Sequence, residues 1–427
     1  MNLHGPTILI LPLALLLVLG CAGQMDEPPE SLVGGDVHDE SDAVHADIDH
    51  VFEDVGAVRD ADVSEVIEPD SGDGQEDIVE SEDDALVDAA EDIVEEPTGP
   101  FRLYLAPNGV DTRDGRTPQT AILTMGRVQE ILTDENPGRD VEVLIAPGRY
   151  FGQTVEWRYT RPDHSITFSR LTPESDRPVF DGCLVENPTN LQTQCPGGTW
   201  FMLRHSNGER TNLVFNYIRV ERYQTAISLN GARNAEETFN SHNRIFGCYF
   251  KDIGNGYADH VAPSTAVVRL VNSNDNQIEN NHFVNVINTR SPALIHALYV
   301  AHLSHRNTIA RNRFENHTGD AVRLRDYSND NVITDNRFNK AGATAGYTDW
   351  YCDHDVRDDC TKVGPECPSW GNQFRDNTLN GNYQCNPLGT WHYFQGDSTT
   401  GCSPPSADAR RVRTSGNVQT EPPCSGL

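Results

Sequence analysis

The chain has 427 residues and a formal net charge of −31, because 64 acidic residues stand against 33 lysines and arginines. The acidic balance and the lack of a basic stripe argue against nucleic acid as a partner. The charge is concentrated in residues 22–99, which hold 28 acidic residues and one basic residue, Arg59, for a net charge of −27. The rest of the chain is close to neutral and long enough for one large domain.

The N-terminal region carries an apolar stretch that ends at a cysteine. Residues 8–19 are apolar, which is too short to cross a hydrocarbon core of ~30 Å but has the length of the apolar part of a signal peptide. The string Val18-Leu19-Gly20-Cys21 resembles a bacterial lipobox, although residues 1–7 contain no lysine or arginine. The resemblance implies a lipoprotein signal peptide over residues 1–20, lipidation of Cys21 and export. A plain secretory signal with a coincidental cysteine is the alternative.

Residues 21–99 are predicted to form a disordered acidic tether. Phe52 is the only aromatic residue in this segment, so the segment cannot bury enough apolar surface to offset the entropy lost on ordering. Repulsion between like charges favours an extended chain. We interpret the tether as a spacer that holds a domain away from a membrane; a cation-binding tract is the alternative.

Nine cysteines remain after Cys21, and in an exported protein they are predicted to form disulfides. Cys183 and Cys195 enclose a short loop and are expected to pair. Zinc binding is not favoured, because the sequence contains no C-x-x-C pair. Six further cysteines lie near the C-terminus, where the sequence leaves the pairing open: Cys352, Cys360, Cys367, Cys385, Cys402 and Cys424.

The folded part contains an internal repeat. Each copy begins with asparagine, has an apolar residue two positions later and ends on a large apolar residue. The five clear copies are Asn243–Phe250, Asn276–Phe283, Asn307–Phe314, Asn331–Phe338 and Asn372–Leu379, and a sixth from Asn212 fits with one residue deleted. Repeats with a spacing of about 20–50 residues indicate a solenoid or a propeller.

A second strand pattern precedes the repeat in several copies. These short alternating runs suit β-strands and cover residues 226–229, 266–270, 297–300 and 321–324. A propeller would need about four strands in each repeat of about 40–45 residues, and the required motifs are missing. The short unit from Asn307 to Asn331 fits one coil of a solenoid.

These residues resemble right-handed parallel β-helix proteins of the pectate-lyase-like kind, from residue 101 to about 395. The resemblance implies an all-β, right-handed parallel β-helix over residues 100–427, with a disulfide-rich C-terminal end and a capping helix at about 125–133. It implies little about activity, because this fold supports many functions. Three N-terminal strings are similar to the first coil of secreted β-helices: Tyr104–Gly109, Asp114–Pro118 and Val141–Tyr150.

Two positions of the repeat are expected to form columns. Asparagine tolerates left-handed backbone geometry and bonds nearby backbone groups, so a ladder is predicted at a turn between strands. Cys248 occupies the ladder position in its copy and is predicted to be a buried, unpaired thiol. The ladder comprises Asn281, Asn312, Asn336 and Asn377, and the stacked core column comprises Phe250, Phe283, Phe314 and Phe338.

Candidate site residues lie on strands beside three insertions, at about 251–265, 284–296 and 339–371. Insertions in a solenoid often gather on the binding face, so we expect them to wall a groove. Alternation along the strand sends Arg323 and Arg325 outward. Tyr299 is predicted to stack on Arg323 one coil away, with Arg269 within one residue of the same column a further coil away.

This arrangement suits an anionic glycan. A lyase must neutralise a uronate carboxylate and remove the adjacent proton, so Arg323 and Arg325 are candidates for the first task. Tyr299 or His302 is the candidate base, and Arg269 is a candidate substrate ligand. An outward arginine ladder paired with nearby aspartates, Asp320 and Asp326, is the alternative.

An acidic loop lies between Cys352 and Cys360. Spaced carboxylates could hold Ca²⁺, a hard cation that binds several oxygens, although the loop lacks the glycine and terminal glutamate of an EF-hand. A solvated acidic loop is the alternative. Trp350 and Tyr351 beside it are expected to stack on sugar rings, or to cap the end of the solenoid. The candidate calcium ligands are Asp353, Asp355, Asp358 and Asp359.

A glycoside hydrolase would need two carboxylates about 5–10 Å apart. Asp320, Asp326 and Asp335 are candidates, but no Asp-Asp pair resembles the polygalacturonase pattern. The sequence also contains no G-x-S-x-G, P-loop or H-E-x-x-H motif, so serine hydrolases, nucleotide hydrolases and zinc proteases are not supported.

We therefore expect an exported, lipid-anchored, monomeric β-helix protein at the cell surface or in the periplasm. Its expected partners are a membrane, through the N-terminal lipid, and an acidic polysaccharide, which it would cleave by β-elimination. Ca²⁺ is the one cofactor considered. A non-catalytic glycan-binding or surface-structural protein is the alternative, because no full catalytic signature is present.

Overall fold

The computed structural model describes residues 99–233, 235–258, 266–353, 355, 358, 360, 366–393, 402 and 412–426. The predicted signal peptide, Cys21 and the acidic tether lie outside the described residues. Among the described residues, no helix has both the length and the apolar character needed to span a bilayer.

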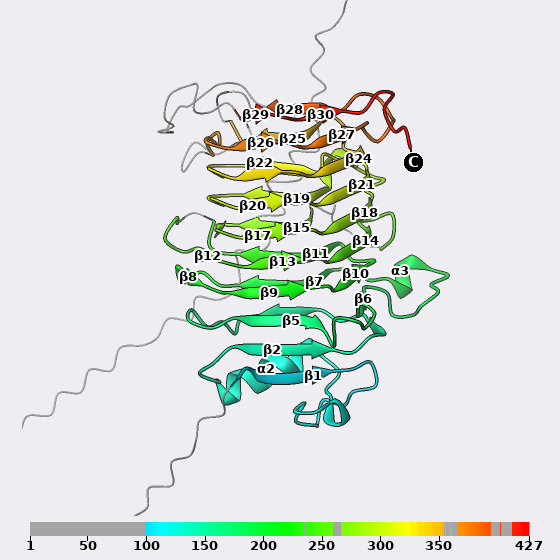
Figure 1. Cartoon of the computed structure of the whole chain (residues 1–427), viewed down its shortest axis with the longest axis vertical. Helices are drawn as coiled ribbons and strands as arrows, with labels where there is room; N and C mark the ends of the chain where they lie inside the picture. Colours follow the sequence, from blue (N-terminus) through cyan, green and yellow to red (C-terminus); the bar gives the residue numbers. More distant parts are fainter. Residues whose placement is uncertain are drawn as a thin grey trace, which may run out of the picture. The chain divides into compact units, whose positions relative to one another are not determined.

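The described chain winds into a right-handed parallel β-helix, which confirms the predicted fold. Strands from successive coils stack into three long sheets and one short sheet, and the pairs are parallel (Figure 1). The ten-stranded sheet contains β1 (Phe101–Leu105), β2 (Val141–Ile145), β5 (Ile166–Arg170), β9 (Leu213–Asn216), β13 (Arg244–Phe246), β17 (Gln277–Glu279), β20 (Thr308–Ala310), β23 (Val332–Thr334), β26 (Gln373–Arg375) and β29 (Arg413–Ser415).

The other sheets complete the coils. The nine-stranded sheet contains β3 (Arg149–Phe151), β6 (Val179–Asp181), β10 (Arg219–Glu221), β14 (Tyr249–Ile253), β18 (His282–Val286), β21 (Arg313–His317), β24 (Arg337–Ala341), β27 (Thr378–Asn380) and β30 (Val418–Gln419). The eight-stranded sheet contains β4 (Val155–Trp157), β7 (Thr199–Arg204), β11 (Thr225–Asn230), β15 (Ala266–Val271), β19 (His296–Ala301), β22 (Val322–Arg325), β25 (Ala345–Trp350) and β28 (Gly389–Tyr393). A three-stranded sheet at one corner contains β8 (Glu209–Arg210), β12 (Asn240–Ser241) and β16 (Ser273–Asn274).

A helix caps the first coil, as predicted. Helix α2 spans Met125–Glu135, begins after Thr124, whose hydroxyl accepts the Arg127 N–H, and ends at Asn136 in a left-handed conformation. Its apolar face joins the hydrophobic core of the stack and comprises Met125, Val128, Ile131 and Leu132. The remaining helical segments are short: α3 (Leu191–Gln194) and the 3₁₀ turns η1 (Pro118–Thr120) and η2 (Pro292–Leu294).

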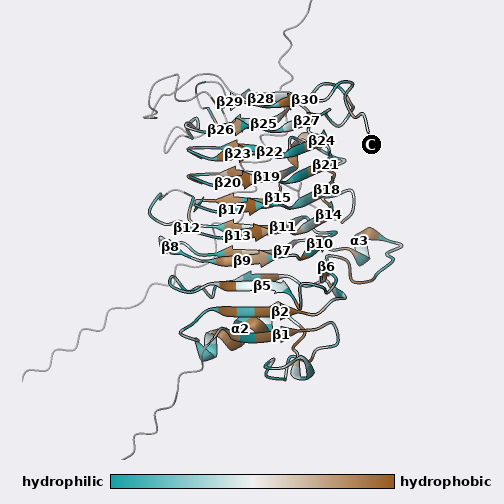
Figure 2. Cartoon of the chain, in the orientation of Figure 1, coloured by the Kyte–Doolittle hydropathy of each residue, from teal (hydrophilic) through white to brown (hydrophobic). Residues whose placement is uncertain are grey.

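The core is a set of aligned apolar columns inside the coils. The predicted phenylalanine column is confirmed, because Phe250, Phe283, Phe314 and Phe338 occupy one register position, with ring centroids 4.9–5.2 Å apart. In Figure 2, brown apolar positions recur along the strands between hydrophilic ones, and many turns are hydrophilic. Burial of these columns supplies the main driving force for folding.

Two asparagine ladders connect the coils. The predicted ladder is confirmed and continues to Asn417, and a second ladder runs through Asn243, Asn276, Asn307, Asn331 and Asn372. In both ladders, wherever one asparagine follows another, the side-chain oxygen accepts the backbone N–H and the side-chain amide of the asparagine in the preceding coil. These bonds satisfy buried polar groups at the corners, where no sheet partner is present.

The left-handed backbone conformation expected at the ladder asparagines is found one residue earlier. The residue with positive φ is the one before each ladder asparagine, such as Arg311 (φ 57°) before Asn312 and Asp335 (φ 57°) before Asn336. The preceding residue therefore makes the left-handed turn, and asparagine is present for its amide.

The placement of the insertions also needs a correction. The first two precede strands of the eight-stranded sheet, as expected. The third range, 339–371, contains the end of β24 and all of β25, so the segment between repeats is residues 351–371, which follow β25 in the sequence. Two insertions therefore connect the nine-stranded to the eight-stranded sheet, and the third connects the eight-stranded to the ten-stranded sheet.

The cysteines are paired as expected for an exported protein. Cys183–Cys195 is confirmed, and the other bonds are Cys352–Cys360, Cys367–Cys402 and Cys385–Cys424. Cys248 is unpaired and buried, and burial raises the pKa of its thiol to about 12. Disulfides persist in oxidising compartments, so these four bonds indicate an extracytoplasmic protein.

We expect Asn312→Ala to lower the free energy of unfolding by about 2–5 kcal/mol, because it leaves buried backbone groups without partners. Asn312 accepts two hydrogen bonds from Asn281 and donates to the Ile278 carbonyl and to Asn336. Denaturant unfolding measures the change. The control, Asn339→Ala, removes one half-exposed contact with Asn380 and should cost less than about 1.5 kcal/mol. Equal losses in the two variants would contradict a special role for the ladder.

Candidate functional site

The outward face of the eight-stranded sheet carries one polar column. The predicted stacking of Tyr299 on Arg323 is confirmed, and Arg269 pairs directly with Tyr299 on the other side. The column continues through Thr348 and His392. Neighbouring strands lie about 4.8 Å apart, so a phenol stands between two guanidinium-bearing residues on three successive strands.

Burial differs along this column. Tyr299 is 2% exposed and Arg323 is 8% exposed, whereas Arg269 is half-buried. The Arg323 Nε donates to the Thr348 hydroxyl at 2.9 Å. Arg269 is therefore the member of the three through which a solute would first meet the column.

Two buried carboxylates lie near Arg323. Asp320 accepts the backbone N–H groups of Ala343, Thr344 and Ala345 through one oxygen. Burial raises its pKa, while Arg323 and these amides act in the opposite direction. Burial also raises the pKa of Asp349 to about 7, against hydrogen bonds from Tyr347 and Ser369.

Arg325 makes a different set of contacts on the same face. Its Nε and one terminal nitrogen donate to the two oxygens of Glu366 at 2.7 and 2.6 Å, and the other terminal nitrogen donates to the Tyr299 hydroxyl at 2.9 Å. The guanidinium also lies 4.2 Å from the ring centre of Trp350. Arg325 is thus paired with Glu366, a partner that the sequence analysis did not propose.

Glu366 fixes the segment after β25 against the sheet. One oxygen also accepts from Arg233 at 2.6 Å and the other from the Cys352 N–H at 2.8 Å. Burial alone would raise the pKa of Glu366, but the charges of Arg325, His302 and Arg233 lower it overall. The predicted neutralising residue Arg325 is therefore already paired with a carboxylate.

His302 directly follows the last residue of β19 and lies at the corner of the coil, three residues after Tyr299 in the sequence. It is buried, and its Nδ1 lies 3.0 Å from an Asp326 oxygen. Among the described residues, His302, Asp326 and Glu366 bring ligand-type atoms within 4.8 Å of one another. Each Glu366 oxygen already accepts two hydrogen bonds. The guanidinium groups of Arg325 and Arg233 also lie beside it, and their positive charge would repel a cation, so this cluster is poorly suited to a metal ion.

The described members of the predicted calcium set differ in their burial. Asp353 is buried, with its oxygens near the Tyr351 hydroxyl and the Asp355 N–H, whereas Asp355 and Asp358 are exposed. Asp359 lies outside the described residues. The calcium assignment stays a prediction.

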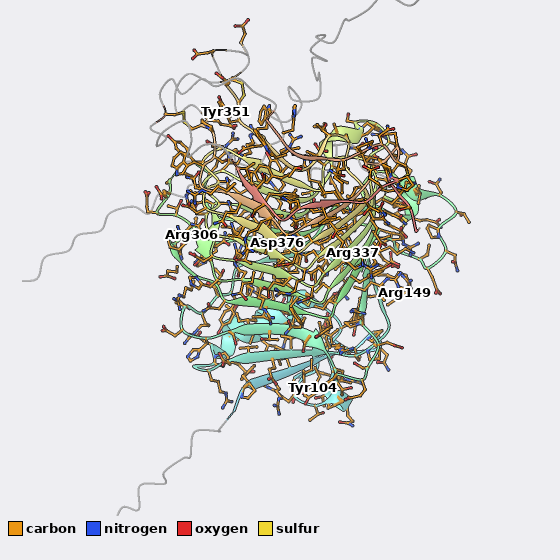
Figure 3. The ribbon with its side chains drawn as sticks, turned by 45° about the horizontal axis from the view of Figure 1, so that its top comes forward. Tyr104, Arg149, Arg306, Arg337, Tyr351 and Asp376 are labelled. Atoms are coloured by element: carbon orange, nitrogen blue, oxygen red, sulfur yellow. A yellow bond between two sulfur atoms is a disulfide. The ribbon has the colours of Figure 1, made fainter. Side chains whose placement is uncertain are left out.

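The candidate sugar-stacking residues are also enclosed. Trp350 and Tyr351 are each 3% exposed, and Trp350 packs under Arg325. Figure 3 marks Tyr351 at the C-terminal end of the stack. Their role on a sugar stays a prediction, as do the catalytic roles of Tyr299, Arg323, Arg325 and His302.

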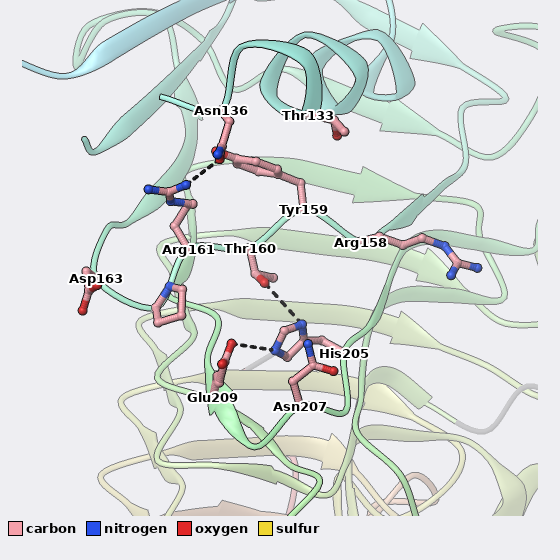
Figure 4. Close-up of a pocket in the computed structure, with 11 residues that line it drawn as sticks. Thr133, Asn136, Arg158, Tyr159, Thr160, Arg161, Asp163, His205, Asn207 and Glu209 are labelled. Carbon is pink, nitrogen blue, oxygen red and sulfur yellow. Dashed lines mark hydrogen bonds and ion pairs between the residues drawn. The ribbon is translucent and has the colours of Figure 1, made fainter. Parts of the chain in front are cut away.

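A separate polar hollow of about 490 Å³ lies beside the first coils (Figure 4). It was not anticipated from the sequence, and neither was the contribution of Glu366 or Arg233. His205 and Glu209 stand outside the recognisable repeats, and Glu366 is 41 residues from Arg325. None of them carries a local signal, because each acquires its neighbours through the winding of the coils.

Comparisons with known proteins give distant structural similarity. Neither a protein-family model nor a curated protein sequence matches the chain. The structure is similar to an alginate lyase from Paenibacillus sp. str. FPU-7, with a TM-score of 0.43 and 13% identity over 70% of this chain and 94% of that one. It is also similar to pectate lyase Pel9A, with a TM-score of 0.39 and 12% identity over 75% of this chain and 78% of that one. The similarity to a rhamnogalacturonan lyase has a TM-score of 0.32 and 12% identity over 74% of this chain and 87% of that one. These similarities are too distant to transfer a substrate or a residue role.

Glu366→Gln should weaken folding at neutral pH by about 3–5 kcal/mol, because it leaves buried Arg325 without its counter-charge. The lowered pKa of Glu366 makes its contribution complete above its unfolded pKa of about 4.3 and lost as the pH falls below that value. The free energy of unfolding, measured from pH 7 to pH 2, should therefore fall less steeply with decreasing pH in the variant than in the parent. The control is Glu142→Gln, which breaks a surface pair with Arg102 and should cost at most about 1 kcal/mol. An unchanged acid dependence in the Glu366 variant would contradict this assignment.

Asp349→Asn should act in the opposite direction. Because the folded-state pKa is raised to about 7, stability falls as the pH rises from the unfolded value near 4 to about 7, and the loss is complete above it. The neutral amide removes this loss, so the variant should be more stable than the parent at pH 8 by up to about 4 kcal/mol. Denaturant unfolding at pH 4 and pH 8 measures the difference. A variant that is less stable at both values would show that the carboxylate is required in its charged form.

Proposed function

We propose that this protein acts on an acidic polysaccharide by β-elimination at the column Arg269–Tyr299–Arg323. The observation that carries the proposal is the strand register, which places the Tyr299 phenol between two arginines on the outward face of one sheet. Arginine pairs with carboxylates through charge-assisted hydrogen bonds. A uronate carboxylate held by this column would bring its neighbouring C–H bond close to the phenol.

The chemistry assigns one task to each residue. Arg323 and Arg269 bind the carboxylate and stabilise the negative charge that develops on it when the adjacent proton is removed. Tyr299 in its deprotonated form accepts that proton as general base. The electron pair of the C–H bond forms the new double bond while the glycosidic C–O bond breaks, and the leaving oxygen takes up a proton.

Arg325 is a positioning residue in this proposal. It is engaged with Glu366 and donates a hydrogen bond to the Tyr299 oxygen, which fixes the phenol relative to the sheet. This differs from the expectation that Arg325 neutralises the substrate. His302, which faces Asp326 at the following corner, is assigned no step.

The proposed location is the outer side of a bacterial membrane, with a lipid on Cys21 as the anchor. The four disulfides support the compartment, and the lipobox resemblance supports the lipid. The acidic segment up to residue 99 would then separate the β-helix from the membrane surface.

A second candidate function is a non-catalytic glycan-binding or surface-structural protein. The observation that favours it is the near-complete burial of Tyr299 and of the Arg325–Glu366 pair. In that case these polar residues serve to hold the segment after β25 on the sheet.

The test is the ultraviolet absorbance of unsaturated uronate products with polygalacturonate, alginate and glycosaminoglycans, each with and without Ca²⁺. We expect activity on one polymer, with Arg323→Ala, Arg269→Ala and Tyr299→Phe each lowering kcat/KM at least about 100-fold. The control is Arg337→Ala, an exposed arginine on β24 in the nine-stranded sheet (Figure 3), which should keep full activity. Thermal unfolding of each variant separates loss of chemistry from loss of fold. A flat trace with every polymer would overturn the lyase proposal and favour the binding protein.

A further inference from the structure

The polar hollow beside the first coils is built by the two chain segments that leave β4 and β7. Residues 158–163 form one wall and residues 205–209 form the other, with the end of α2 above them (Figure 4). The volume of about 490 Å³ lies within the range of about 300–1,000 Å³ typical of small-molecule sites. The hollow does not include the column Arg269–Tyr299–Arg323.

His205 is the buried polar group of this hollow. Its side chain is more than nine-tenths buried, and its Nδ1 lies 3.2 Å from the Thr160 hydroxyl. The Nε2 atom is buried and makes no hydrogen bond within the described part of the chain. The nearest acidic oxygen, on Glu209, is 4.0 Å away, which is too far for a hydrogen bond.

Among the described residues, the His205 imidazole lacks a hydrogen-bond partner at Nε2. Burial lowers the pKa of His205, so the ring is neutral at neutral pH and carries one N–H. When the Thr160 hydroxyl donates to Nδ1, that hydrogen is on Nε2, where a buried donor without an acceptor is costly. A hydroxyl group can accept from Nε2 and at the same time donate to the Glu209 carboxylate, and it is the simplest group that satisfies both.

The remaining wall is also suited to hydroxyl groups. Arg161 donates to the Asn136 side-chain oxygen, which also accepts from the Tyr159 hydroxyl, so the guanidinium is held in place while keeping further N–H donors. Arg158 and Arg161 are matched in number by Asp163 and Glu209. The lining therefore has no excess charge that would select an ion, but it presents both donors and acceptors at close spacing.

We propose that this hollow is a binding site for an uncharged sugar residue, with one ring hydroxyl bridging His205 and Glu209 and others bound by Arg161. The proposal does not depend on β-elimination at the sheet column, and it assigns the protein a second carbohydrate contact on its N-terminal coils.

Saturation-transfer NMR with the full chain is the test, using glucose, galactose, xylose, N-acetylglucosamine and their β-linked disaccharides as probes, and galacturonate as the charged comparison. We expect at least one neutral sugar to bind and to shift the His205 ring signals. Glu209→Ala and His205→Ala should each weaken that binding at least tenfold. His205→Gln, which restores a donor, should recover part of it even if the alanine variant folds poorly.

Two controls make the result specific. Glu174→Ala changes an exposed glutamate outside the hollow and should leave sugar binding unchanged. Arg323→Ala should also leave it unchanged, which separates this site from the proposed lyase site. The proposal is overturned if none of the neutral sugars shifts the His205 signals, if only galacturonate does, or if Glu209→Ala binds as the parent does.

Discussion

The hydrogen bonding of one coil to the next is the interaction on which the rest of the structure depends. In the sheets the backbone supplies these bonds, but at the corners the backbone turns away and leaves buried groups without partners. The asparagine ladders supply the missing acceptors there, since the side-chain oxygen of one asparagine accepts both the backbone N–H and the amide of the asparagine in the coil before it. The corners therefore keep the same spacing as the sheets, and the coils remain in register along the stack.

This register turns sequence positions into columns. A residue on one strand has the equivalent residues of the next coils as its nearest neighbours, at about 4.8 Å. Inside the coils this produces the phenylalanine column, and outside it produces the alignment of Arg269, Tyr299 and Arg323. Arg325 lies two residues further along the same strand and on the same face, so it belongs to the neighbouring column, next to Ala301 and Trp350. From there it contacts Glu366, Trp350 and the Tyr299 hydroxyl. The different roles of the two arginines follow from this separation along the strand.

The predictability of each feature from sequence depends on whether it belongs to the repeat. The solenoid, the core phenylalanines and the stacking of Tyr299 on Arg323 follow from a spacing that the sequence displays, whereas the handedness and the capping helix are implied by the resemblance to pectate-lyase-like β-helices. The last coil was not predicted from the repeat, because Val412 occupies the position of the first asparagine. Only Asn417, in the ladder of Asn377, matches the repeat there. Glu366 and His205 lie in segments between repeats, and the neighbours of such residues are set by where a loop returns to the stack. Sequence spacing contains no information about that return, so the ion pair at Arg325 and the hollow at His205 emerged only from the structure.

The charges of Arg269 and Arg323 determine which kind of ligand the polar column would favour. Arg269 and Arg323 stand two strands apart, about 9–10 Å, where two like charges repel by about 2 kcal/mol at an effective dielectric constant of about 20. Tyr299 lies between them in the register, and Arg325 has Glu366 at hydrogen-bond distance. In the proposed lyase reaction, an anion bound at Tyr299 would be attracted by both arginines. A neutral sugar gains nothing from this attraction. The register that builds the fold thus aligns the Tyr299 phenol with two arginines, and this alignment is what supports the proposed preference for a carboxylate.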